Sequence, residues 1–246
     1  MSTRAPEETD LLCENCGYML NGLPPSGSCP ECGTAIDFSL SERFRQPPLW
    51  EIIGDPRPKW LRFILTTAQV IFRPKRFYRS STSRGQLGPA YAFAQIHRSI
   101  CSLLLGLAAW FHWDSYQRVF NYLRPPPSWL GMLLLLALPL GAFLALSGTI
   151  RLAARLTAWE AAYRGYRLPH AVVLRALYYH SAHLLPVATI AFITCAGYDF
   201  LLRHGWLQTT SEPVYLYILC GEVIVAAAYL FNTYWIGMRN LMYANR

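Results

Sequence analysis

Charged residues are scarce in this chain of 246 residues: they make up 15% of the sequence, against 53% hydrophobic residues. Lysine is almost absent. Lys59 and Lys75 are the only two, so the net charge of +8 comes almost entirely from arginine. The mean hydropathy is positive, at +0.21. Soluble globular domains carry about 25% charged residues, so this composition argues against an ordinary soluble globule.

A secretory signal peptide is also missing. The first forty residues contain no apolar stretch of the required length, about 7–15 residues, behind a basic start. We therefore expect the N-terminus to stay in the cytosol.

Sequence motifs of catalysis are absent as well. The chain has no glycine-rich phosphate loop, no G-x-S-x-G, no H-E-x-x-H and no pair of carboxylates at catalytic spacing. No residue stands out as catalytic or as a binder of an organic cofactor, and we expect a protein that is not an enzyme.

Cysteine, in contrast, is concentrated. Four of the seven cysteines lie within twenty residues in the pattern C-x2-C-x12-C-x2-C: Cys13, Cys16, Cys29 and Cys32. Two such pairs on two turns can present four thiolates tetrahedrally, which is the arrangement that structural Zn²⁺ prefers. With sulfur at all four positions, no open position is left for a catalytic water.

Other roles for these cysteines have less support from the sequence. Two disulfides would require an oxidising compartment, and a redox C-x-x-C needs one pair in a thioredoxin-like βαβ unit. Iron is the closer rival to zinc, because CxxCGY and CPECG resemble the two knuckles of rubredoxin. Rubredoxins, however, place a longer, aromatic-rich segment between the knuckles. Gly17 and Gly33 follow the two pairs, where glycine tolerates the positive φ that such turns require.

The motifs C-x-x-C-G-Y-x-L-x-G-L and C-P-E-C-G resemble the short zinc ribbons at the N-termini of many bacterial multi-span membrane proteins. The resemblance implies a ribbon at residues 1–40 with Zn²⁺ as its structural metal. A segment this short buries little core, so metal binding would supply most of its folding free energy.

Four apolar runs are long enough to cross about 30 Å of hydrocarbon. They are Pro89–Trp113, Ser128–Ile150, His183–Leu202 and Pro213–Ile236. The predicted fold class is therefore an all-α polytopic membrane helix bundle of about four transmembrane helices with a small N-terminal zinc ribbon. Arg98 lies in the first half of the first run, and we expect it to extend to the lipid headgroups.

The distribution of charge predicts the topology. Residues 1–42 hold one basic residue and seven acids, whereas residues 43–98 hold eleven basic residues and two acids. Arginine is also frequent between the second and third runs and rare in the other two loops, which favours a cytoplasmic membrane protein with both termini cytosolic. Within a linker at residues 41–86, Pro58–Phe72 is apolar but too short to span. We expect either an amphipathic helix at the lipid surface or a helix packed on the bundle.

Three polar positions in the apolar runs are candidates for function. Glu222 lies near mid-depth of the last run, where it is either an ion-coupling group or a protonated glutamic acid bonded to a neighbouring helix. Asp199 is expected to be solvated and to pair with Arg203. His180 and His183 share one helical face, and interfacial histidines are a better interpretation than a second metal site.

The region from about Phe72 onward, which includes the predicted bundle at residues 87–246, loosely resembles the Yip1 domain of multi-span membrane proteins. The resemblance rests on F-R-P-K-R-F-Y-R (Phe72–Arg79) followed by a compact set of spans, although that family usually has five. It implies an interaction or membrane-organising role.

The expected partners are the lipid bilayer and a cytosolic protein that binds the ribbon. A homo-oligomer is left open. A transporter or channel component that uses Glu222 is the alternative function. Membrane-tethered nucleic-acid binding is disfavoured, because the ribbon is acidic.

Overall fold

The computed structural model describes residues 10–40, 45–82, 85–120, 127–166, 168–207 and 212–245. Within these ranges the chain forms α-helices, short 3-10 helices and isolated β-bridges, with no strand. The predicted all-helical fold class is confirmed. Residues 1–9 of the predicted ribbon lie outside the described residues, as do Arg43 and Arg84 of the basic linker.

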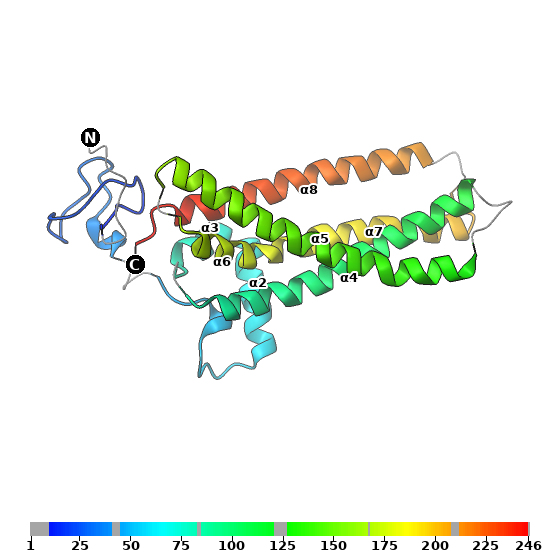
Figure 1. Cartoon of the computed structure of the whole chain (residues 1–246), viewed down its shortest axis with the longest axis horizontal. Coiled ribbons are helices and arrows are strands. Elements are labelled where there is room, and N and C mark those ends of the chain that lie inside the picture. The colour runs from blue at the N-terminus through cyan, green and yellow to red at the C-terminus, as the bar shows by residue number, and fades with distance from the viewer. Residues whose placement is uncertain are drawn as a thin grey trace. The chain divides into compact units, whose positions relative to one another are not determined.

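In the described part of the chain, four helical stretches are long and apolar enough to cross a membrane, which confirms the predicted number. Three are the single helices α4 (Leu87–Phe120), α5 (Ser128–Tyr163) and α8 (Glu212–Leu241). In the fourth, α6 (His170–His180) leads through the 3-10 turn η3 (Ser181–His183) into α7 (Leu184–Arg203), as Figure 1 shows. The chain is therefore an integral membrane protein by the length and composition of its helices.

The helices run beyond the apolar stretches that predicted them. Helix α5 has 36 residues, or about 54 Å at a rise of about 1.5 Å per residue, whereas the hydrocarbon core is only about 30 Å thick. Its second half carries the exposed residues Arg151 and Arg155. The alanine-rich segment after Ile150 is thus part of the same helix.

Contacts along the chain divide it into two compact units, each described by itself. Unit 1 comprises Met1–Ala94, Ile150–Ala182 and Asn232–Arg246, and unit 2 comprises Gln95–Thr149 and His183–Phe231. The ribbon belongs to unit 1, together with α6 and the adjoining parts of α4, α5 and α8. The boundaries predicted from the sequence (1–40, 41–86 and 87–246) stay a prediction.

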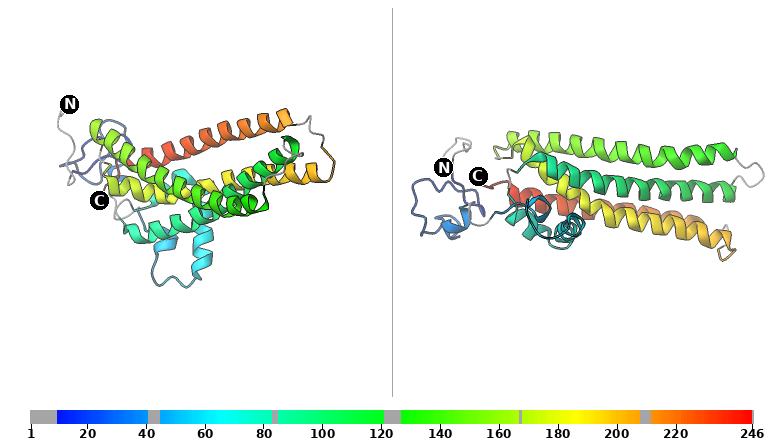
Figure 2. Two further views of the ribbon diagram at one scale, coloured as in Figure 1. Left: turned by 45° about the vertical axis from the view of Figure 1, so that its right-hand side comes forward. Right: turned by 90° about the horizontal axis from the view of Figure 1, so that it is seen from below.

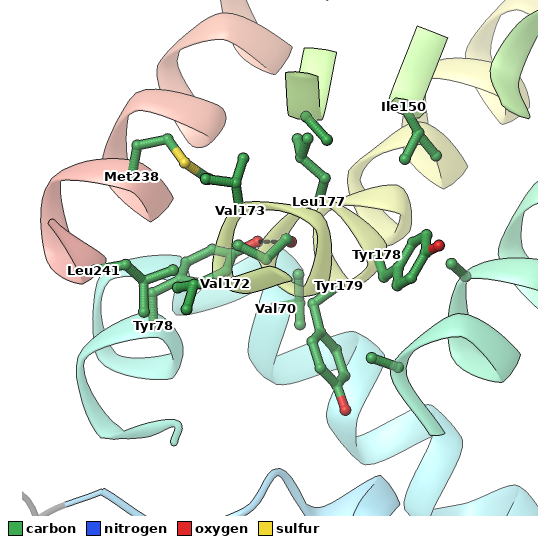
Figure 3. Packing of buried hydrophobic residues seen from close by; sticks show 14 of the residues in the cluster. Val70, Tyr78, Ile150, Val172, Val173, Leu177, Tyr178, Tyr179, Met238 and Leu241 are labelled. Carbon is green, nitrogen blue, oxygen red and sulfur yellow. Dashed lines mark hydrogen bonds between the residues drawn. The ribbon is translucent and has the colours of Figure 1, made fainter. Parts of the chain in front are cut away.

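The core of unit 1 is built around α6. Val173 and Leu177 of α6 lie in one buried cluster with Val70 of α2 (Lys59–Phe72) and with Met238 and Leu241 of α8 (Figure 3). The short helix α3 (Pro74–Ser80) joins through its buried aromatic side chains. Residues far apart in the sequence thus share one apolar core.

Helix α2 forms where the sequence predicts it, within Pro58–Phe72. One side is buried in unit 1 through Thr66 and Val70. Trp60 (64% exposed), Ile64 (52%) and Phe72 (79%) remain accessible. Of the two predicted alternatives, packing on the helices of unit 1 is confirmed, and it leaves a second apolar side uncovered.

A buried ion pair joins the 3-10 turn η2 (Leu49–Glu51) to α6. The guanidinium of Arg175 donates to both carboxylate oxygens of Glu51, at 2.6 and 2.9 Å, and the Tyr179 hydroxyl donates to the same carboxylate. Both charged side chains are almost fully buried. This pair could not be predicted from local sequence patterns, because 124 residues separate its members.

In unit 2 the long helices run alongside one another (Figure 2). Helices α4 and α5 approach closely at Gly106, where an added Cβ would lie 2.4 Å from the backbone nitrogen of Pro139. Phe111 of α4 packs against Phe192 of α7. Small residues permit such close backbone approach between membrane helices.

Two sequence-based expectations in unit 2 are wrong. Arg98 does not extend outward: it is 2% exposed, and it donates to the Ser147 hydroxyl of α5 at 3.0 Å and to Gln95. Asp199 pairs with Arg203 as expected, at 2.5 Å, but it is buried rather than solvated and also accepts a hydrogen bond from Ser115. A hydroxyl group on a neighbouring helix bonds to each of these side chains, Ser147 to Arg98 and Ser115 to Asp199.

Candidate metal centre

The first cysteine pair lies on a tight turn. The amide of Gly17 donates to the Cys13 carbonyl at 2.8 Å, and the amide of Cys13 donates to the Tyr18 carbonyl at 2.8 Å. Gly17 has a φ of +81°, as the sequence predicts for this position. The turn places Cys13 and Cys16 on the same side of the backbone.

The second pair repeats this geometry. Gly33 (φ +71°) donates to the Cys29 carbonyl at 2.9 Å, and Cys29 donates to the Thr34 carbonyl at 2.8 Å. An isolated antiparallel bridge closes each turn, Leu12 with Met19 and Ser28 with Ala35. The ribbon, residues 10–40, is therefore two equivalent knuckles facing each other.

The knuckles bring the four predicted ligands together. The Sγ atoms of Cys13 and Cys32 lie 3.5 Å apart, those of Cys16 and Cys29 lie 3.6 Å apart, and all four fall within 4.8 Å of one another. Sulfurs at about 2.3 Å from a tetrahedral zinc ion lie about 3.8 Å apart. All four cysteines are free rather than disulfide-bonded. The cluster therefore lies at metal-binding distance.

The thiols differ in acidity. Burial raises the pKa of Cys13 and Cys16 above its ordinary value. Hydrogen bonds from the Thr34 side chain and backbone lower the pKa of Cys32 to about 6. A metal ion would bind all four as thiolates, so its binding must displace the protons of Cys13 and Cys16.

The ribbon is attached to the chain's C-terminal segment within unit 1. The side-chain Nδ2 of Asn245 donates to the carbonyls of Leu12 and Ser39, both at 2.7 Å. The side-chain Oδ1 of Asn245 accepts a hydrogen bond from the backbone N–H of Leu12 at 2.9 Å. Tyr243 lies against Gly17, where an added Cβ would come within 2.6 Å of the ring. Sequence analysis did not identify either residue.

A second attachment is ionic. Glu14 lies between the ligands of the first knuckle, and Arg45 donates to both of its carboxylate oxygens at 2.9 and 3.0 Å. The same guanidinium donates to the carbonyls of Tyr78, Ser81 and Asn240. Arg45 thus ties the first knuckle to α3 and to the end of α8.

The other predicted candidates do not form a second metal site. His180 contacts the Thr233 hydroxyl at 3.0 Å, and His183 contacts the Tyr229 hydroxyl at 2.7 Å. Among the described residues, the four cysteines are the only group of three or more His, Cys, Asp or Glu side chains close enough to hold a metal ion. The two histidines serve as hydrogen-bonding groups between helices.

Glu222 is bonded to the neighbouring helix. The Thr194 hydroxyl of α7 donates to Glu222 Oε1 at 2.5 Å, and Oε2 is buried with no hydrogen-bond partner in the part of the chain that is described. The predicted contact with another helix is therefore present.

Comparison of the chain with protein-family models, curated proteins and solved structures finds no match. The similarity to bacterial zinc ribbons and to the Yip1 domain rests on the motifs quoted above. Conclusions about function depend on the geometry of the cluster and its surroundings.

Proposed function

We propose that the chain is a non-enzymatic scaffold of a bacterial cytoplasmic membrane, whose cytosolic ribbon holds a structural Zn²⁺ ion and recruits a cytosolic protein. The closed cluster of four sulfurs carries this proposal. Four sulfurs complete a tetrahedral shell, which leaves the metal no position for substrate or water. Such a site stabilises a surface and performs no reaction.

The size of the ribbon core supports a structural metal. Its buried cluster consists of Leu20 and Ile36 with Cys13 and Cys29, so two of its four members are ligands themselves. A core this small cannot offset the conformational entropy of ordering the segment. Metal binding would supply the folding free energy that the core lacks, as it does in small zinc modules generally.

The exposed side chains of the ribbon support a protein partner. Tyr18, Met19 and Phe38 are 41%, 37% and 53% exposed. Aromatic residues and methionine are enriched in protein interfaces, and a ribbon fixed by Asn245 and Arg45 presents them without further ordering. Reduced thiolates and the arginine-rich segments next to the spans favour a cytosolic location.

Site-specific photo-crosslinking tests the recruitment. A photoreactive amino acid at Phe38 or Tyr18, introduced into the full chain in cells, should capture one soluble protein. The same amino acid at the exposed residue Ser26 of the ribbon is the matched control. The capture should disappear with Cys29→Ser. Capture of the same proteins from all three positions, or capture that survives Cys29→Ser, would contradict recruitment by a folded ribbon.

A transporter or channel component is the second candidate, and the partnerless Oε2 of Glu222 favours it. A carboxyl group at mid-membrane with one oxygen unbonded can bind a proton or a cation. Glu222→Gln preserves the shape of the side chain and removes its charge. Loss of a transport activity in this variant, with the Phe38 cross-link unchanged, would favour transport over scaffolding.

A further inference from the structure

A polar pocket lies in unit 1 beside α2 and α3. Its volume is about 500 Å³, and its walls come from the segment around η2, the end of α2 and one side of α3. Pockets of this size accept small molecules and headgroups rather than single ions. It lies apart from the cysteine cluster.

The pocket is strongly basic. Of the described residues, Arg57, Arg73 and Arg76 line it, and no acidic residue does. Arg57 is neutralised by Asp55, at 2.7 Å. Arg73 and Arg76 are exposed and have no carboxylate within ion-pair distance among the described residues. The pocket therefore carries about two uncompensated positive charges.

The donors in the pocket suit a phosphate group. The planar guanidinium fork of arginine binds two phosphate oxygens at once, which lysine cannot do. Gln46, Gln69 and Ser80 add neutral donors to the same walls. The side chains of Leu49 and Phe77 provide an apolar part, so the ligand has both a charged and a carbon-rich end.

The surroundings point to a lipid as the source of the phosphate. Arg73 and Arg76 also line a shallow cavity of about 480 Å³ with Phe72, which is 79% exposed. Trp60 and Ile64 continue the exposed apolar side of α2. Tryptophan beside basic residues is typical of segments that lie at the membrane surface.

We propose that the pocket lined by Arg73 and Arg76 binds the phosphate headgroup of an anionic membrane lipid, with Phe72 beside its acyl chains. The two guanidinium groups hold the phosphate, and the apolar side of α2 contacts the hydrocarbon. This is a defined site, unlike the diffuse attraction of a basic segment to an anionic surface.

Lipid binding to the delipidated full chain in detergent, measured by native mass spectrometry, tests the proposal. Wild-type protein should bind phosphatidylglycerol more tightly than phosphatidylcholine. Arg73→Gln/Arg76→Gln should weaken phosphatidylglycerol binding about tenfold or more, because two charge-assisted contacts are lost. Arg151→Gln/Arg155→Gln is the matched control: it removes the same charge from exposed positions of unit 1, and neither residue lines the pocket or the shallow cavity beside Phe72. It should leave the affinity within about twofold.

Three outcomes would overturn the proposal. Equal weakening in both double variants would mean diffuse electrostatic attraction. Equal affinity for the two lipids would mean no recognition of the headgroup charge. Displacement of phosphatidylglycerol by glycerol 3-phosphate at similar concentration would identify a soluble phosphate as the ligand.

Folding of the variants is checked by their thermal unfolding. If the double glutamine variant unfolds, Arg73→Lys/Arg76→Lys replaces it, because lysine keeps the charge and loses the fork. The preference for phosphatidylglycerol should then fall, and an unchanged affinity would count against the pocket.

Discussion

The side chain of Asn245 and the backbone of Leu12 exchange two hydrogen bonds across 233 residues of sequence, at 2.7 and 2.9 Å. Leu12 directly precedes the first cysteine of the cluster, and Asn245 follows the end of α8. The buried side-chain amide of Asn245 thus takes the place of the water molecules that would otherwise bond to the backbone of Leu12. The position of the ribbon within unit 1 depends on this contact.

Asn245→Ala should therefore loosen the ribbon. The substitution leaves the buried amide of Leu12 and the carbonyl of Ser39 unsatisfied, which costs about 1–3 kcal/mol. Hydrogen exchange of residues 10–40 should accelerate by about tenfold or more, since about 1.4 kcal/mol corresponds to a factor of ten. Asn232→Ala, at an exposed position of α8, is the control and should leave the exchange unchanged. Unchanged exchange in both variants would mean that Asn245 does not hold the ribbon.

The two knuckle glycines should respond differently to alanine. Both have positive φ, so each substitution costs about 1–2 kcal/mol of backbone strain. A Cβ at Gly17 also meets the Tyr243 ring at 2.6 Å, whereas a Cβ at Gly33 meets nothing within 4 Å. Gly17→Ala should lower the thermal unfolding temperature more than Gly33→Ala, and adding Tyr243→Ala should remove the difference. Equal effects of the two single variants would show that Tyr243 does not press on the first knuckle.

Close packing of α4 on α5 predicts a second contrast between glycines. Gly106→Ala would place a methyl group 2.4 Å from the Pro139 nitrogen, so the helices must separate. Gly141→Ala on α5 meets open space. The first variant should lose stability by about 1–3 kcal/mol, as overpacked sites do, and the second should be neutral. Unfolding in detergent of both variants measures the difference, and equal stability would refute the close approach.

Metal uptake should release at least two protons per chain at pH 7 and fewer than four. The raised pKa of Cys13 and Cys16 keeps both thiols protonated, while the lowered pKa of Cys32, about 6, leaves that thiol already ionised. Below pH 6 Cys32 is protonated as well, so one more proton must leave and the apparent affinity falls more steeply. Calorimetric titration with zinc in buffers of different ionisation enthalpy counts the protons. Release of four at pH 7 would contradict the ionised state of Cys32.

The features that sequence predicts here are local ones. The four spans follow from long apolar runs, and the cysteine cluster follows from two C-x-x-C-G turns whose geometry depends on neighbouring residues. Helix α5 extends beyond its run, because the alanine and arginine residues after Ile150 are strong helix formers. Local pattern was therefore enough for the elements and for the four candidate ligands.

The features that the sequence did not predict are long-range polar contacts. Arg98 and Asp199 were expected near solvent or headgroups, yet both are buried against polar groups of other helices. Nothing in the sequence near Arg45 or Asn245 indicates that their partners lie on the first knuckle. Contacts of this kind depend on how the helices pack against one another, and the hydrophobic pattern of the sequence does not predict that packing.

The metal content of the purified full chain, measured beside Cys13→Ser and Cys29→Ser, tests the central claim most directly. The full chain is the right sample, because Arg45, Tyr243 and Asn245 complete the surroundings of the ribbon. We expect one zinc ion per chain in the wild type and none in either variant. Iron with a red colour would instead make the ribbon an electron-transfer module, and a metal-free chain with two disulfides would contradict both the structural zinc and the cytosolic location of the N-terminus.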